Sequence, residues 1–107
     1  MQFPQGEGQI DVVKKIRMIE WLKAELVGSV ASLLKSMVKG GEERILDYLA
    51  AILITTYILG KRVGITFARI DQHLKEKLAA GIDEEHEIEE WYGDMSSLLR
   101  YMEGKKR

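Results

Sequence analysis

Residues 45–60 read ILDYLAAILITTYILG, and this stretch decides the fold. Asp47 is its only charged residue, and apolar residues occupy every side of the helical wheel. A helix of this kind is expected to be surrounded by protein. A membrane span is the alternative, but it needs about 20 mainly apolar residues. Because this run is shorter and contains Asp47, Thr55 and Thr56, we expect a core helix and no membrane partner.

The flanking residues indicate where this helix begins and ends. Glu42 and Glu43 suit the positive end of a helix dipole, and Gly40-Gly41 before them stops the preceding helix. Lys61 and Arg62, followed by Gly64, are typical of a helix C-terminus. The predicted helix therefore covers residues 42–62.

Three further helices are expected around it. Asp11 is a candidate N-cap for a helix over 11–39, whose apolar residues recur at spacings of three and four. Thr66 is a candidate N-cap for a helix over 67–80, which Gly81 closes. A fourth apolar periodicity predicts a helix over 84–103.

The short connections favour antiparallel neighbours, so the predicted fold is an all-α, four-helix antiparallel bundle. We expect a single helical domain over 11–104, preceded by a flexible tail (1–10) that contains Pro4. A short basic tail (105–107) follows it.

Composition narrows the function. The 107 residues include no cysteine, which excludes thiolate metal sites and suits a cytoplasmic location. Sixteen basic and seventeen acidic residues give a net charge of −1, so nothing indicates nucleic-acid binding. A domain this small buries only about 65% of its unfolded surface. We therefore expect a homodimer or a higher homo-oligomer.

Asp47 is the most informative polar residue, because a carboxylate inside an apolar bundle is costly unless it is paired or binds a metal. One interpretation is a salt bridge or a hydrogen bond near the helix start. The other is a Mg²⁺ site, since Glu43 precedes Asp47 by one helical turn. Glu25 would complete the site if the first two helices pack antiparallel.

Small side chains follow Glu25 along the same flank, at Ser29, Ser32 and Ser36. They could admit another helix closely or leave space for a ligand. His73 and His86 have no nearby histidine or cysteine partner, which argues against zinc. Trp91 and Tyr92 are expected to be core or interface anchors.

Two motifs resemble those of MazG-type nucleotide pyrophosphohydrolases. The stretch ELVGSVASLLK (residues 25–35) is similar to the family's first motif helix, approximately EEVGELAELFK. The stretch ERILDYL (residues 43–49) is similar to the second motif, approximately EELADVL. The C-terminal part looks like the subgroup called MazG-like proteins, and the resemblance covers most of the chain after residue 12.

The resemblance implies an all-α oligomer that uses Mg²⁺ to cleave nucleoside triphosphates (NTP or dNTP) to monophosphate and pyrophosphate. The four acidic positions of the family fall here on Leu26, Ser29, Arg44 and Asp47, so only Asp47 is kept. Glu25 and Glu43 match the accessory acids just before two of these positions. Arg44 would repel a cation and attract phosphate.

Two functions follow from this pattern. One is an active pyrophosphohydrolase whose reduced Mg²⁺ site consists of Glu25, Glu43 and Asp47. The alternative is a catalytically inactive, MazG-like helical dimer that binds nucleotides, with Arg44 contacting phosphate, or binds another protein.

Overall fold

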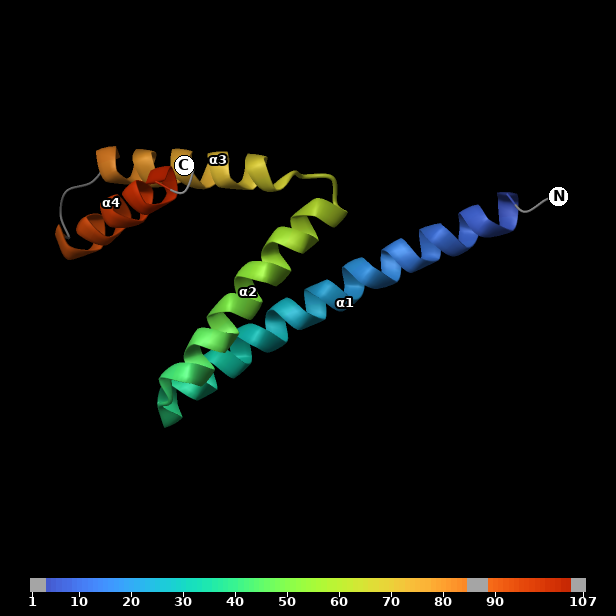
Figure 1. Cartoon of the computed structure of the whole chain (residues 1–107), viewed down its shortest axis with the longest axis horizontal. Helices are drawn as coiled ribbons and strands as arrows, with labels where there is room; N and C mark the ends of the chain where they lie inside the picture. The colour runs from blue at the N-terminus through green and yellow to red at the C-terminus, as the bar shows by residue number, and fades with distance from the viewer. Residues whose placement is uncertain (1–3, 85–88, 105–107) are drawn as a thin grey trace. The chain divides into compact units, whose positions relative to one another are not determined.

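The computed structural model describes the backbone of residues 4–84 and 89–104 and the side chains of residues 11–82 and 93–104. The fold is all-α, as predicted, with four helices in the described ranges: α1 (Pro4–Lys39), α2 (Glu42–Arg62), α3 (Phe67–Glu84) and α4 (Glu89–Gly104) (Figure 1). Helix α1 packs on α2, and α3 packs on α4. The chain divides into two compact units, Met1–Ile65 and Thr66–Arg107. The single helical domain over 11–104 stays a prediction.

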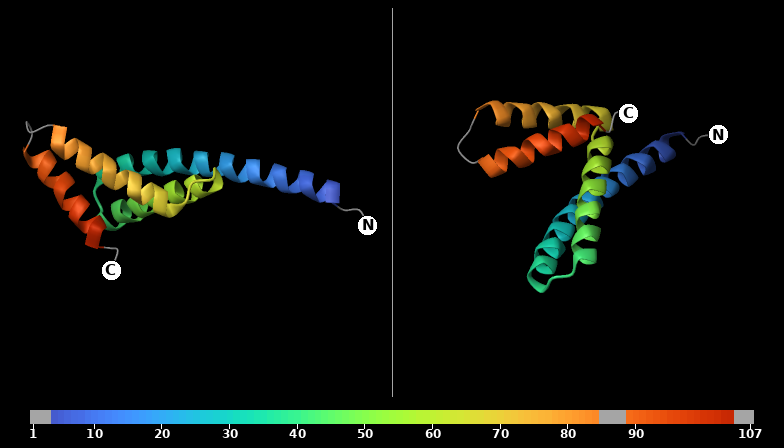
Figure 2. Two further views of the ribbon diagram at one scale, coloured as in Figure 1. Left: turned by 90° about the horizontal axis from the view of Figure 1, so that it is seen from above. Right: turned by 60° about the vertical axis from the view of Figure 1, so that its left-hand side comes forward.

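Helices α1 and α2 form an antiparallel hairpin with a two-residue link, and the views in Figures 1 and 2 show them side by side. Gly40 and Gly41 in this link have φ angles of 86° and 106°, which residues with a Cβ rarely adopt. The backbone N–H of Gly40 donates to the carbonyl of Ser36 at 2.8 Å and closes α1. The link therefore ends one helix and begins the next without a loop between them.

The far end of α2 is a Schellman motif. The N–H of Ile65 donates to the carbonyl of Gly60 at 2.8 Å, and the N–H of Gly64 donates to that of Lys61 at 3.0 Å. Gly64 has a φ of 94°, as the left-handed residue of this motif requires. The predicted bounds of this helix, 42–62, are confirmed at both ends.

Helix α1 begins earlier than predicted, at Pro4 rather than Asp11. Proline is well tolerated in the first helical turn, because its missing N–H has no intrahelical acceptor there. Adding residues to an existing helix is also much easier than starting a new one. Residues 4–10, expected to be a tail, are therefore helical.

Helix α3 starts as predicted, with the Thr66 hydroxyl accepting a hydrogen bond from the N–H of Arg69 at 3.1 Å. It does not end at Gly81, however, but continues to Glu84. A Cβ on Gly81 would meet the end of the flexible Met95 side chain in α4, which would have to shift. Gly81 thus lies inside α3, close to α4, instead of ending the helix.

The fourth helix was predicted over 84–103 and is observed over Glu89–Gly104. Residues 85–88, including His86, lie outside the described part of the chain. The side chains of Trp91 and Tyr92 also lie outside it, so their predicted anchoring role stays a prediction.

Within the unit Met1–Ile65, residues 45–60 are less covered by protein than expected. Thr55 is the one buried residue of α2, whereas Leu46, Leu53 and Ile54 are each about 60% exposed. Within this unit α1 packs on α2, and one neighbour covers one side of a helix. The buried residues of the hairpin form a thin contact: Leu22, Leu33, Ser36 and Thr55.

Within the described residues, no single helix is long and apolar enough to cross a membrane. Helices α2 and α3 are long and apolar enough for such a span only when they are counted together as one bent segment.

The left-handed link predicts a specific stability effect. Gly41→Ala should lower the free energy of unfolding by about 1–2 kcal/mol, because the new Cβ meets a disfavoured φ. Gly28→Ala is the matched control: Gly28 lies inside α1 with open space around it, so alanine should stabilise by about 0.5–1 kcal/mol. Urea unfolding measures both changes in the free energy of unfolding. Equal changes in the two variants would contradict the requirement for a left-handed residue in the link.

Candidate functional site

The three acids predicted to share a metal are all exposed: Glu25, Glu43 and Asp47. Glu25 precedes the end of α1 by fourteen residues, whereas Asp47 follows the start of α2 by five. At 1.5 Å per residue, the two therefore lie about 13 Å apart along the hairpin axis. The two-residue link leaves no slack to remove this offset, so antiparallel packing alone does not bring Glu25 to Asp47.

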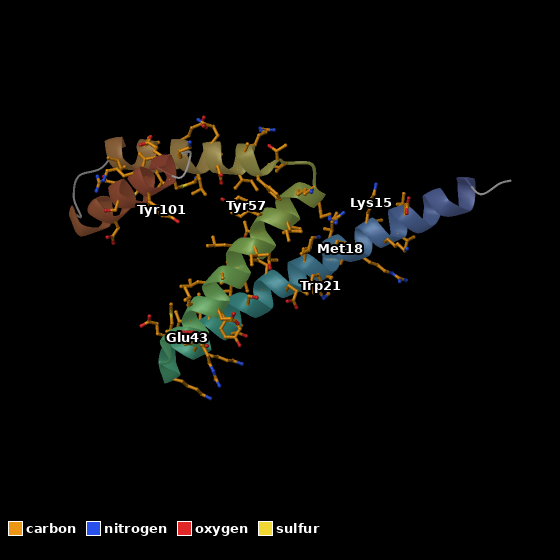
Figure 3. All side chains as sticks on the ribbon, viewed as in Figure 1. Lys15, Met18, Trp21, Glu43, Tyr57 and Tyr101 are labelled. Carbon is orange, nitrogen blue, oxygen red and sulfur yellow. The ribbon has the colours of Figure 1, made fainter. Side chains whose placement is uncertain are left out.

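In the part of the chain that the structure describes, no three histidine or acidic side chains come close enough to hold a metal ion. Glu43 and Asp47 remain one turn apart on α2, with Glu43 in the first turn beside the glycine link (Figure 3). Asp47 is exposed and forms no ion pair with a described residue, so it is not the salt-bridged core carboxylate of the first interpretation. Its role as a metal ligand stays a prediction. Within the described residues of one chain, the carboxylates do not come together as the Mg²⁺ site implied by the resemblance would require.

A pocket of a different chemistry lies at the closed end of the hairpin. Its volume is about 400 Å³. Both helices and the link line it, and we call it the basic pocket: Ser32, Lys35, Ser36, Val38, Lys39, Gly40, Arg44 and Tyr48.

Local sequence explains why these side chains converge. Lys35 and Lys39 are four residues apart in the last two turns of α1, so they extend from neighbouring positions on one side of the helix. Arg44 is the third residue of α2, directly across the glycine link. Tyr48 follows Arg44 by one turn and is partly buried. Ser36 is only 7% exposed and is the buried polar residue of the pocket lining.

The charge of the basic pocket has one sign. Lys35, Lys39 and Arg44 line it, and no carboxylate is among its lining residues. Within the described residues, none of the three forms an ion pair or a side-chain hydrogen bond. Three unpaired cations around one concave surface attract an anion, and repel one another when no anion is present.

Helix stabilisation explains only part of this arrangement. Lys35 and Lys39 lie near the C-terminus of α1, where the helix dipole favours positive charge. Arg44 lies in the first turn of α2, where the dipole disfavours it. The helix dipole therefore does not account for the position of Arg44.

Sequence reasoning found part of this site. Arg44, expected to contact phosphate, lines the basic pocket, and Ser32 and Ser36 from the small-residue flank also open onto it. Lys35, Lys39 and Tyr48 were missed. The signal was present, because two lysines one turn apart precede Gly40-Gly41 and an arginine follows it closely.

Other candidates have simpler explanations. His73 is exposed, and its Nδ1 lies 3.6 Å from the Glu76 carboxylate on the next turn of α3. A second pocket, between α3 and α4, has a volume of about 350 Å³ and is lined mainly by apolar side chains: Leu74, Lys77, Leu78, Asp94, Met95 and Leu98. Nothing in its lining points to phosphate chemistry.

The exposure of Asp47 can be tested through stability. Asp47→Asn should change the free energy of unfolding by no more than about 0.5 kcal/mol, because the carboxylate is exposed and without an ionic partner. Thermal or urea unfolding measures this. A loss of about 3 kcal/mol or more would instead indicate a buried carboxylate in a salt bridge.

Comparison with known proteins places this geometry in a family. No curated protein and no solved structure matches the chain. The model of the MazG-like family matches residues 12–95, which include both motif helices and the whole basic pocket. Because that match covers most of the sequence, the chain belongs to the MazG-like family.

Proposed function

We propose that this chain is a nucleotide-binding, catalytically inactive MazG-like protein that holds the phosphates of a nucleoside triphosphate in the basic pocket. The observation that carries this proposal is the set of three unpaired cations, Lys35, Lys39 and Arg44, around one pocket between the two motif helices. Family membership supports a nucleotide as the ligand.

The lining suits a polyphosphate chain. The guanidinium of Arg44 can donate two parallel hydrogen bonds to one phosphate group, and the lysines supply mobile point charges. The hydroxyls of Ser32, Ser36 and Tyr48 are further donors on the same surface. A volume of about 400 Å³ is also within the usual size of a small-molecule site.

Hydrolysis is the rival function, and membership of the family is the observation that favours it. In this chemistry, carboxylates hold Mg²⁺, which neutralises phosphate charge and orients the attacking water. The described chain keeps Glu43 and Asp47 one turn apart but leaves Glu25 about 13 Å along the axis. The donor set therefore supports binding more than cleavage.

Binding and cleavage are separated by one set of measurements. ATP should bind the wild-type protein in calorimetry, and Arg44→Gln should weaken this binding about tenfold or more, since a hydrogen bond to a charged group is worth about 1.5–3 kcal/mol. Arg62→Gln is the control: it removes the same charge from the same helix, about 27 Å away along the axis. Equal losses in the two variants would reject the basic pocket as the site.

The same protein should release no pyrophosphate from any common NTP or dNTP with Mg²⁺ present. Pyrophosphate release above a no-protein control, lost in Asp47→Asn, would instead establish the hydrolase.

We also propose that two copies of the hairpin associate. Besides the residues that face α2, helix α1 carries apolar side chains that are 40–87% exposed: Val27, Val30, Leu34 and Val38. Helix α2 adds Leu46, Leu49 and Leu53, which are 42–60% exposed. Spacings of three and four residues make each set a continuous stripe. A second copy offers an apolar surface of the same kind, which would remove these stripes from water.

Association predicts a change of mass on substitution. The wild type should sediment as a dimer or larger oligomer, and Leu34→Lys or Leu53→Lys should shift it toward the monomer by placing a charge in the interface. Ala79→Lys, an exposed position of α3, adds the same charge in the other unit and should change nothing. A wild-type monomer at all concentrations in analytical ultracentrifugation would contradict association.

A further inference from the structure

The sign of the charge in the basic pocket distinguishes two forms of the same ligand. In neutral solution a nucleoside triphosphate exists free or as its Mg²⁺ complex, in which the metal bridges phosphate oxygens and offsets part of their negative charge. A site that holds the complex supplies oxygen ligands for the metal or its waters. A site that holds the free anion supplies positive charge in place of the metal.

The lining of the basic pocket supplies positive charge, as a site for the free anion would. Lys35, Lys39 and Arg44 provide three positive charges, and no described carboxylate lines the pocket with them. The nearest acids in sequence are Glu42, Glu43 and Asp47, which are exposed and are not among the lining residues. Together with the absence of a three-ligand metal cluster in the described residues, this leaves the phosphates without a carboxylate-held metal in the lining.

The unpaired state of the cations adds a second argument. Like charges one helical turn apart, such as Lys35 and Lys39, destabilise the helix that carries them. Arg44 adds a third positive charge across a link of only two residues. Each additional negative charge on the ligand relieves more of this repulsion, so the free polyphosphate is favoured over its metal complex.

We infer that the basic pocket binds the metal-free polyphosphate, so that Mg²⁺ competes with the protein for the ligand rather than bridging the two. The cations of Lys35, Lys39 and Arg44 take the place that a divalent ion holds in Mg²⁺-dependent nucleotide sites. This inference rests on the proposed nucleotide-binding function and specifies the form of nucleotide that is bound.

The test is calorimetry with two probes, ATP and inorganic tripolyphosphate, each in EDTA and in excess Mg²⁺ at matched ionic strength. Binding of both probes should be about tenfold weaker with Mg²⁺, since a difference of about 1.4 kcal/mol is a factor of ten. Matching the ionic strength separates this effect from general screening of charge. Lys39→Gln should weaken binding in EDTA more than in Mg²⁺, which narrows the ratio between the two conditions. The control Lys77→Gln, on α3, should leave that ratio at its wild-type value.

The outcomes separate the two proposals. Binding that is equal or tighter in Mg²⁺ would overturn the inference and leave the proposed nucleotide binding intact. No binding of either probe in either condition would overturn the proposed function itself. Weaker binding in Mg²⁺ with an unchanged ratio in Lys39→Gln would also overturn the inference, because the cations of the pocket would then not be the cause.

Discussion

The two glycines that link α1 to α2 determine where every charged side chain of the hairpin lies. Both adopt positive φ, and together they reverse the chain between Lys39 and Glu42 without a loop. A longer loop would let the helices slide past one another, whereas a two-residue link sets which turn of α1 lies beside which turn of α2. Residues near the link on either helix are therefore neighbours, and residues at different distances from it are not.

This register has opposite consequences for acids and bases. Glu25 lies far from the link and Asp47 near it, so the two carboxylates stay apart although their helices pack antiparallel. Lys35, Lys39 and Arg44 all lie within about two turns of the link, so they come together around one pocket. The same geometric constraint separates the expected metal ligands and assembles the basic pocket.

The helix ends could be predicted from the sequence where they depend on residues nearby in the chain. The acids at the start of α2, the Schellman glycine at its end and the Thr66 cap each act on neighbouring residues, and each was foreseen. Gly81 shows the limit, because a glycine expected to end α3 lies inside it, close to Met95 of α4. Residues 45–60 are less buried within their unit than predicted, for a related reason. Apolar composition indicates that a helix can be buried, but the number of helices packed against it determines how much of its surface is buried.

The position of Arg44 relates the register of the two helices to the proposed nucleotide. Arg44 occupies a position where the family pattern has an acid, and it lies in the first turn of α2, where positive charge opposes the helix dipole. A cation there costs stability and offers no ionic partner within the described chain in return. An acid at this position would attract a metal and, through the metal, phosphate. An arginine attracts phosphate directly, so the exchange removes the metal from the interaction and can still retain the nucleotide. On this argument the missing acids do not rule out the proposed nucleotide, because the basic pocket would hold it by charge of the opposite sign, without the ion that would make its phosphates reactive.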